Sequence, residues 1–128
     1  MREESVREFV EGRAEGQRRL LEAANLTMRR FLALDGDAYA DGALSRKEKE
    51  LCGLVASAVL RCDDCIRYHL QQARAVGASR DEVVEALTVA LVAGGSVVIP
   101  HLRRAVDFLD SLEQGGAAPP SAHDHAQG

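Results

Sequence analysis

Apolar side chains recur every three or four positions along most of this chain, the spacing of amphipathic helices. Between residues 2 and 34 this spacing predicts one interrupted helix or two, because glycines at positions 12 and 16 weaken the middle of the pattern. The apolar positions of the segment are Val6, Phe9, Val10, Leu20, Ala24, Met28, Phe31 and Leu32.

Two capping boxes, in which a serine and a glutamate three residues later satisfy the first backbone groups of a helix, predict helices over residues 46–60 and 80–93. A third helix is expected between them, over 63–76. It should end at Gly77, since glycine readily adopts the left-handed backbone that follows many helices. The two boxes are Ser45 with Glu48 and Ser79 with Glu82.

The stretch from Ala86 to Leu102 has no charged side chain when histidine is neutral. Gly-Gly-Ser and a proline interrupt it, so it is a poor membrane span; burial on several sides, as at a subunit interface, fits it better. A β-branched run at 97–99 precedes a last helix from Pro100 through Leu112. The pattern predicts an all-α domain over residues 1–113 and a disordered tail over 114–128.

Composition narrows the possible functions. A chain of 128 residues with 46% hydrophobic content suits one globular domain. The net charge of -4 and the absence of tryptophan and of basic runs exclude a nucleic-acid groove. Charges near the N-terminus, where a signal peptide needs an apolar core, predict a cytoplasmic protein without membrane attachment. Its three cysteines are then expected to be reduced.

The most informative motif is a pair of cysteines, Cys62 and Cys65, followed by His69. On a helix these three side chains fall within roughly 60° of one another. Position at a helix start is expected to lower the thiol pKa, most of all for Cys65, whose sulfur His69 can reach one turn later. Asp63 and Asp64 oppose a thiolate by charge repulsion, so we expect a modest net lowering. The motif indicates a redox dithiol.

Glu50 is a further candidate for this site, whereas Cys52 and His101 are given other roles. Glu50 lies twelve positions before Cys62, at the edge of an apolar stripe, where its carboxylate can turn toward the dithiol helix or toward water. Cys52 is interpreted as structural. His101 is assigned a capping or interface role.

The spacing from Glu50 to Cys62, Cys65 and His69, followed by Gly77 and an acidic helix start, resembles the alkylhydroperoxidase D branch of the carboxymuconolactone decarboxylase superfamily. The resemblance covers roughly residues 38–110 and implies a helical bundle that assembles as a homo-oligomer, a trimer or hexamer. It implies no bound cofactor and no resident metal.

The resemblance also implies roles for these residues. Cys65 would attack a hydroperoxide, Cys62 would resolve the product as a disulfide, and Glu50 and His69 would relay protons. A cellular dithiol or redox protein would then reduce the disulfide. Asp64 stands where the best-known peroxidase members carry histidine, which weakens the predicted relay. Lactone decarboxylases of the superfamily lack the cysteine pair.

Two other interpretations remain open at this stage. The cysteines and His69, with Glu50, could form a zinc-binding or structural module, although the second pair of ligands usual in structural zinc motifs is missing. The chain could also be a non-redox enzyme of the superfamily that acts on a small acid or lactone.

Overall fold

The structure is a computed structural model that describes residues 2–114, with side chains from Val6 onward. In this part of the chain every regular element is a helix, as the sequence predicted. The elements are α1 (Arg2–Ala23), α2 (Leu26–Tyr39), α3 (Arg46–Val59), α4 (Asp63–Ala75), α5 (Arg80–Gly94), a 3-10 turn η1 (Ser96–Val98) and α6 (Ile99–Glu113). None of these helices is long and apolar enough to cross a membrane.

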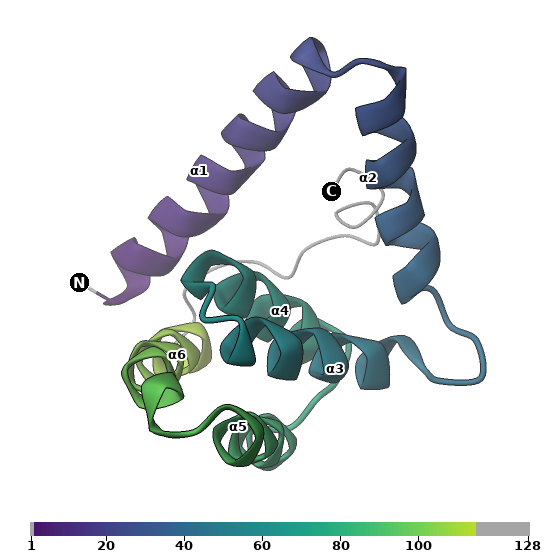
Figure 1. Cartoon of the computed structure of the whole chain (residues 1–128). Coiled ribbons are helices and arrows are strands. Elements are labelled where there is room, and N and C mark those ends of the chain that lie inside the picture. The colour runs from purple at the N-terminus through teal and green to yellow at the C-terminus, as the bar shows by residue number, and fades with distance from the viewer. Residues whose placement is uncertain (1, 115–128) are drawn as a thin grey trace.

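Helices α3 to α6 form a bundle around one core, while α1 and α2 extend from it as two sides of a triangle (Figure 1). Within the bundle α3 packs against α4 and α5, and α6 packs against α4 and α1. The core consists mainly of aliphatic side chains, which include Leu54, Ile66, Leu70, Val83, Val98 and Leu109. The hydrophobic effect of burying them holds α4 in a fixed position between α3 and α6.

The predicted helix ends of the bundle are confirmed. Both capping boxes form, at Ser45 and at Ser79, and α4 ends just before Gly77, whose φ is +98°. The β-branched run forms no strand: Val97 and Val98 belong to η1, and Ile99 begins α6 with Pro100 in its first turn. Proline is well tolerated there because the first N–H groups of a helix have no partner within the helix.

The interruption in the first helical segment lies elsewhere than the glycines suggested. Helix α1 runs through Gly12 and Gly16 without a break. The chain breaks at Asn25, whose side chain accepts a hydrogen bond from the Met28 N–H at 2.9 Å and so caps α2. The predicted domain over 1–113 stays a prediction, and the predicted tail lies outside the described residues except for Gln114.

Candidate active site

Cys62 and Cys65 lie together at the beginning of α4. Cys62 is the residue that caps this helix, and its Sγ accepts a hydrogen bond from the Cys65 N–H at 3.4 Å. The two Sγ atoms are 2.7 Å apart, and both cysteines are free. The dithiol can therefore close into a disulfide with little movement of the backbone.

The connection from α3 to α4 fixes where Cys62 lies. The N–H of Cys62 bonds to the carbonyl of Ser57, and the N–H of Arg61 bonds to that of Ala58, both at 3.0 Å. This pair of bonds is a Schellman motif, in which the residue after the helix takes a left-handed conformation. That residue is Arg61, with φ of +61°. This conformation is energetically unfavourable for a residue other than glycine. The turn that it forms places Cys62 at the beginning of α4.

The side chain of Glu50 points into the bundle, although its sequence position is at the edge of the apolar stripe of its helix. Its side chain is fully buried, with Oε1 at 2.9 Å from Nδ1 of His69. Its other oxygen lies 3.7 Å from Nε of Arg46, and the Arg46 guanidinium also donates to Gln72 Oε1 at 2.6 Å. A buried carboxylate needs such cationic and hydrogen-bonding partners. The structure thus brings Glu50 and His69 together, from two successive helices.

The imidazole of His69 has oxygen partners at both nitrogens. Besides Glu50 at Nδ1, the hydroxyl of Tyr39 lies 3.4 Å from Nε2. The hydrogen bond from this ring to the Cys65 sulfur, expected from the sequence, stays a prediction. Tyr39 was missed because it lies on α2, and nothing in its local pattern shows what α2 faces.

The expected lowering of the Cys65 pKa is wrong. Although Cys65 is exposed on one side, partial burial of its sulfur together with the neighbouring Cys62 and Asp64 raises the pKa of this thiol to about 11, and Arg13 opposes the rise. The backbone N–H of Cys65, at the helix start, donates to the sulfur of Cys62. Cys65 therefore rests as a protonated thiol and needs a base before it can attack as a nucleophile.

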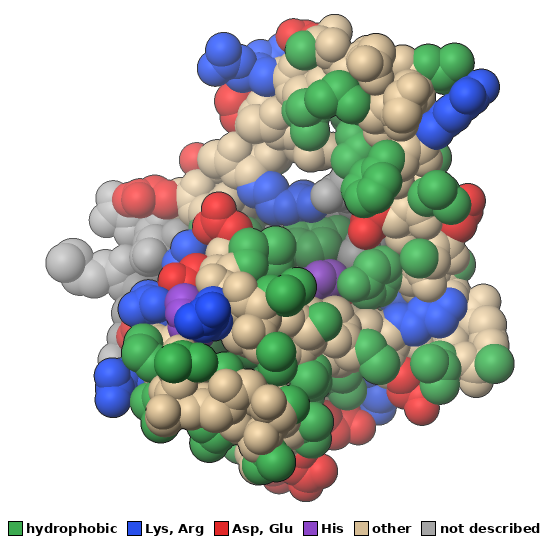
Figure 2. All heavy atoms as spheres, viewed as in Figure 1, with side chains coloured by type: hydrophobic (Ala, Val, Ile, Leu, Met, Phe, Trp, Pro, Cys, Tyr) green, Lys and Arg blue, Asp and Glu red, His purple; other side chains and the backbone are tan. Residues whose placement is uncertain are grey.

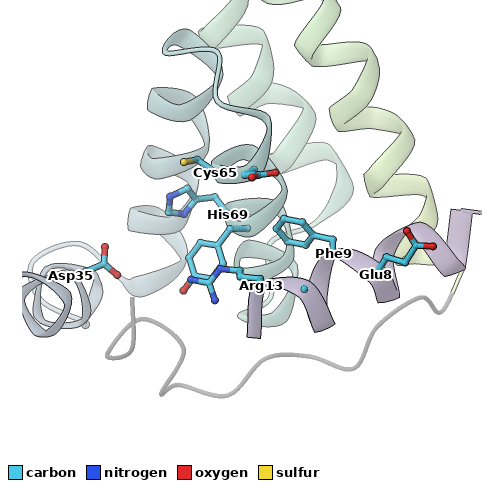
Figure 3. A pocket seen from close by; sticks show the side chains of 9 residues that line it. Glu8, Phe9, Arg13, Asp35, Cys65 and His69 are labelled. Atoms are coloured by element: carbon cyan, nitrogen blue, oxygen red, sulfur yellow. The ribbon is translucent and has the colours of Figure 1, made fainter. Parts of the chain in front are cut away.

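A pocket of about 520 Å³ opens beside Cys65. Figure 3 shows Cys65 and His69 on one side of it, Phe9 and Arg13 of α1 opposite, and Asp35 of α2 at the border. The hollow between the two N-terminal helices and the bundle is visible in Figure 2. The pocket is lined by Glu8, Phe9, Gly12, Arg13, Asp35, Asp64, Cys65, Tyr68 and His69. Four of these residues come from α1.

His101 contacts the beginning of the dithiol helix. Its Nδ1 lies 2.8 Å from Oδ1 of Asp63, and Arg104 Nε lies 2.9 Å from the other oxygen. Burial raises the pKa of the Asp63 carboxyl, but the hydrogen bonds from His101 and Arg104 outweigh it and leave the pKa lowered. These contacts tie α6 to the first turn of α4. Cys52, interpreted as structural, is exposed on α3.

The zinc alternative gains no support from this arrangement. Among the side chains that the structure describes, from Val6 to Gln114, no three histidines, cysteines or acidic residues come together as a metal ion would require. In particular, His69 is committed to Glu50 and Tyr39.

The protein is thus a helical bundle whose candidate site combines a buried glutamate, a histidine and a pair of cysteines. The sequence profile of the carboxymuconolactone decarboxylase family matches residues 25–108, and the chain belongs to this family. The resemblance inferred from the sequence is thereby confirmed. Helix α1 lies outside the matched residues.

Solved structures of the family have the same fold. A carboxymuconolactone decarboxylase family protein of Thermotoga maritima, for which a role in an antioxidative response has been suggested, superposes with a TM-score of 0.82. It is 52% identical, and the match covers 89% of this chain and 99% of that one. A family member from Legionella pneumophila, solved in its apo form, has a TM-score of 0.73 at 26% identity, covering 88% and 98% of the two chains.

One relative known from its sequence has a name that assigns no function. It is an uncharacterized protein of the cox locus of Paracoccus denitrificans, 34% identical over 83 residues, which are 65% of this chain and 75% of that protein.

Proposed function

We propose that this protein is a thiol-dependent oxidoreductase that reduces organic hydroperoxides, with Cys65 as the attacking residue and Cys62 as the resolving residue. One observation carries the proposal: two free sulfurs lie 2.7 Å apart, and one of them borders a pocket beside a histidine paired with a buried glutamate. A non-redox enzyme acting on an acid or lactone has no need for such a pair of sulfurs. The antioxidative role suggested for the T. maritima relative agrees with the proposal.

The reaction proceeds in three balanced steps. Cys65 gives up its proton and its sulfur attacks the distal oxygen of the hydroperoxide; the O–O bond breaks, an alcohol leaves with a proton, and a sulfenic acid forms. The Cys62 thiol then displaces water from this sulfenic acid and closes the disulfide. A cellular dithiol, itself oxidised to a disulfide, reduces the bond and returns both thiols.

Glu50 and His69 supply the base for the first step. The Cys65 thiol, with its raised pKa, has to lose its proton during the attack. His69 can receive this proton, because the buried carboxylate of Glu50 at Nδ1 stabilises the imidazolium that results. The same imidazolium then protonates the leaving alkoxide.

The pocket favours an organic substrate. A volume of about 520 Å³ lies in the range of sites for molecules much larger than hydrogen peroxide. The aromatic side chains of Phe9 and Tyr68 provide apolar surface for the organic group.

Variants of the two cysteines test the proposed roles. In a single turnover of the reduced protein with cumene hydroperoxide, Cys65→Ser should abolish peroxide consumption. Cys62→Ser should consume one equivalent and leave on Cys65 a sulfenic acid that dimedone traps. Cys52→Ser, which removes the exposed third thiol, is the control and should react as the unaltered protein does. Undiminished consumption by Cys65→Ser would refute the assignment.

A further inference from the structure

Tyr39, the last residue of α2, is held against the imidazole of His69. Its hydroxyl oxygen lies 3.4 Å from Nε2, and the two rings stack with their centroids 5.4 Å apart and their planes 25° apart. Helix α2 has no buried residue, yet Tyr39 is half-buried at this contact. Tyr39 thus brings α2 into contact with His69, while Asp35 of the same helix borders the pocket.

The close approach of these two side chains depends on Gly53 of α3. A Cβ atom at position 53 would lie 2.5 Å from the Tyr39 hydroxyl, and 2.7 and 2.9 Å from Cε1 and Nδ1 of His69. All three distances are shorter than non-bonded contacts allow. A glycine in the middle of a buried helix also costs about 0.5–1 kcal/mol relative to alanine. Glycine at position 53 therefore weakens α3 slightly, but it leaves room for the side chains of Tyr39 and His69.

The hydrogen bonds around His69 define where its proton resides. The Glu50 carboxylate, with Arg46 on its other oxygen, accepts the Nδ1–H. Nε2 is then the basic nitrogen, so the Tyr39 hydroxyl donates to it. Burial raises the pKa of Tyr39 to about 12, and the charges of Glu50, Asp35, Cys52 and Cys65 add to the rise. The phenol therefore keeps its proton at neutral pH, and it lies against the imidazole of His69, which borders the pocket together with Cys65.

We propose that Tyr39 relays the proton between the Cys65 thiol and His69 in the peroxidase reaction, a role that rests on the proposed function. In the resting protein its O–H bond holds His69 with Nε2 basic. As Cys65 attacks, the hydroxyl passes its proton to Nε2 and receives one from the thiol side, directly or through a water. The proton returns by the same route to the leaving alkoxide, so Tyr39 ends each turnover as a neutral phenol.

The hydrogen bond of 3.4 Å is long for an O–H donor. Catalytic hydrogen bonds are often long in a protein without substrate and shorten when the reacting groups assemble. The stacked ring and the space left by Gly53 keep the hydroxyl aligned for this shortening.

Tyr39→Phe tests the proposal, because it keeps the ring and removes only the hydroxyl. The measurement is the single-turnover rate of Cys62–Cys65 disulfide formation with cumene hydroperoxide, followed by acid quench and mass spectrometry in mixtures of H₂O and D₂O. We expect the maximal single-turnover rate to fall about tenfold or more. The hydroperoxide concentration that gives half of this rate should change little. A curved dependence on deuterium fraction, from two protons in flight, should become linear in the variant.

Asp37→Asn, in the last turn of α2, is the control. It alters an exposed side chain on the same helix as Tyr39 and leaves the Tyr39 hydroxyl in place. It should keep both the rate and the curved isotope dependence. A purely structural role of Tyr39 would slow the reaction and leave the isotope dependence curved.

The outcomes separate the two proposals. If the unaltered protein forms no disulfide with the hydroperoxide, the proposed function is wrong. If it forms the disulfide, but Tyr39→Phe does so at the same rate or with the same isotope dependence, the relay is wrong and the proposed function stands. A linear isotope dependence in the unaltered protein would overturn the relay as well.

Discussion

The two cysteines at the beginning of α4 have different surroundings. Burial, Cys62 and Asp64 together raise the pKa of Cys65 to about 11, so at pH 7 the thiol is almost entirely protonated. The favourable backbone N–H at the start of α4 goes to Cys62. Such a thiol is protected from adventitious alkylation and reacts once a base removes its proton.

Asp64 gives a direct test of this environment. Its carboxylate contributes to the raised pKa of Cys65, so Asp64→Asn should lower that pKa and speed alkylation of Cys65 by iodoacetamide at pH 8 by roughly two- to tenfold. In the unaltered protein the alkylation rate should rise about tenfold per pH unit up to about pH 11, because the neutral form predominates below that value.

Asp81→Asn, in the first turn of α5, is the control for the loss of one negative charge. It should leave the alkylation profile of Cys65 unchanged. If Asp64→Asn alkylates more slowly, or if Cys65 titrates well below pH 8, the electrostatic account of the thiol is wrong.

The four predicted site residues could be found from sequence because they lie on two helices that follow each other and pack together. Their spacing of twelve, three and four positions places Glu50 opposite the dithiol helix once both helices form. Tyr39 could not be found in this way, since its place depends on how α2 returns to the bundle. Gly53 offered a weak signal, a glycine within an otherwise regular helix.

At the scale of elements, α1 lies outside the residues matched by the family profile and yet lines the pocket. The family profile begins at residue 25, whereas Glu8, Phe9, Gly12 and Arg13 line the space beside Cys65. Phe9 also packs edge to face on Phe108 with centroids 5.5 Å apart, which anchors α1 on α6. The sequence predicted a helix here but not its direction, because periodicity identifies an apolar face without saying which partner covers it.

The turn between α3 and α4 contains an unfavourable backbone conformation that a single substitution can relieve. Arg61 holds a left-handed conformation that glycine adopts readily. Arg61→Gly should therefore stabilise the protein by about 0.5–1 kcal/mol in urea unfolding while the dithiol stays reactive. Arg61→Ala removes the same side chain without relieving the angle, and it should be no more stable than the unaltered protein. Equal stabilisation by both variants would show that the guanidinium, rather than the backbone, is responsible.

On the scale of the whole molecule, much apolar surface is left uncovered. The uncharged segment 86–102 buries Leu87, Ala90 and Val98, but Val92 is 82% exposed. Helix α2 buries no residue, and Phe31 on it is 71% exposed. Other exposed apolar side chains on α2, α5 and η1 are Leu26, Met28, Leu34, Val84, Val89 and Val97. Monomeric proteins rarely leave patches of this kind in contact with water.

We therefore expect the chain to assemble as a homo-oligomer. Sedimentation velocity at micromolar concentration should show a trimer or larger. Phe31→Ser with Leu34→Ser should weaken the assembly, because both side chains lie on the uncovered face of α2. A clean monomer of the unaltered protein would contradict this expectation.

The central claim is that Cys62 and Cys65 form a redox pair, and mapping the disulfide tests it most directly. The fully reduced protein is treated with one equivalent of cumene hydroperoxide, blocked with an alkylating agent, digested and analysed by mass spectrometry. The account predicts one intramolecular bond between Cys62 and Cys65, whose sulfurs already lie 2.7 Å apart, and a free, alkylated Cys52. A dominant bond that involves Cys52, or three free thiols after the treatment, would contradict it.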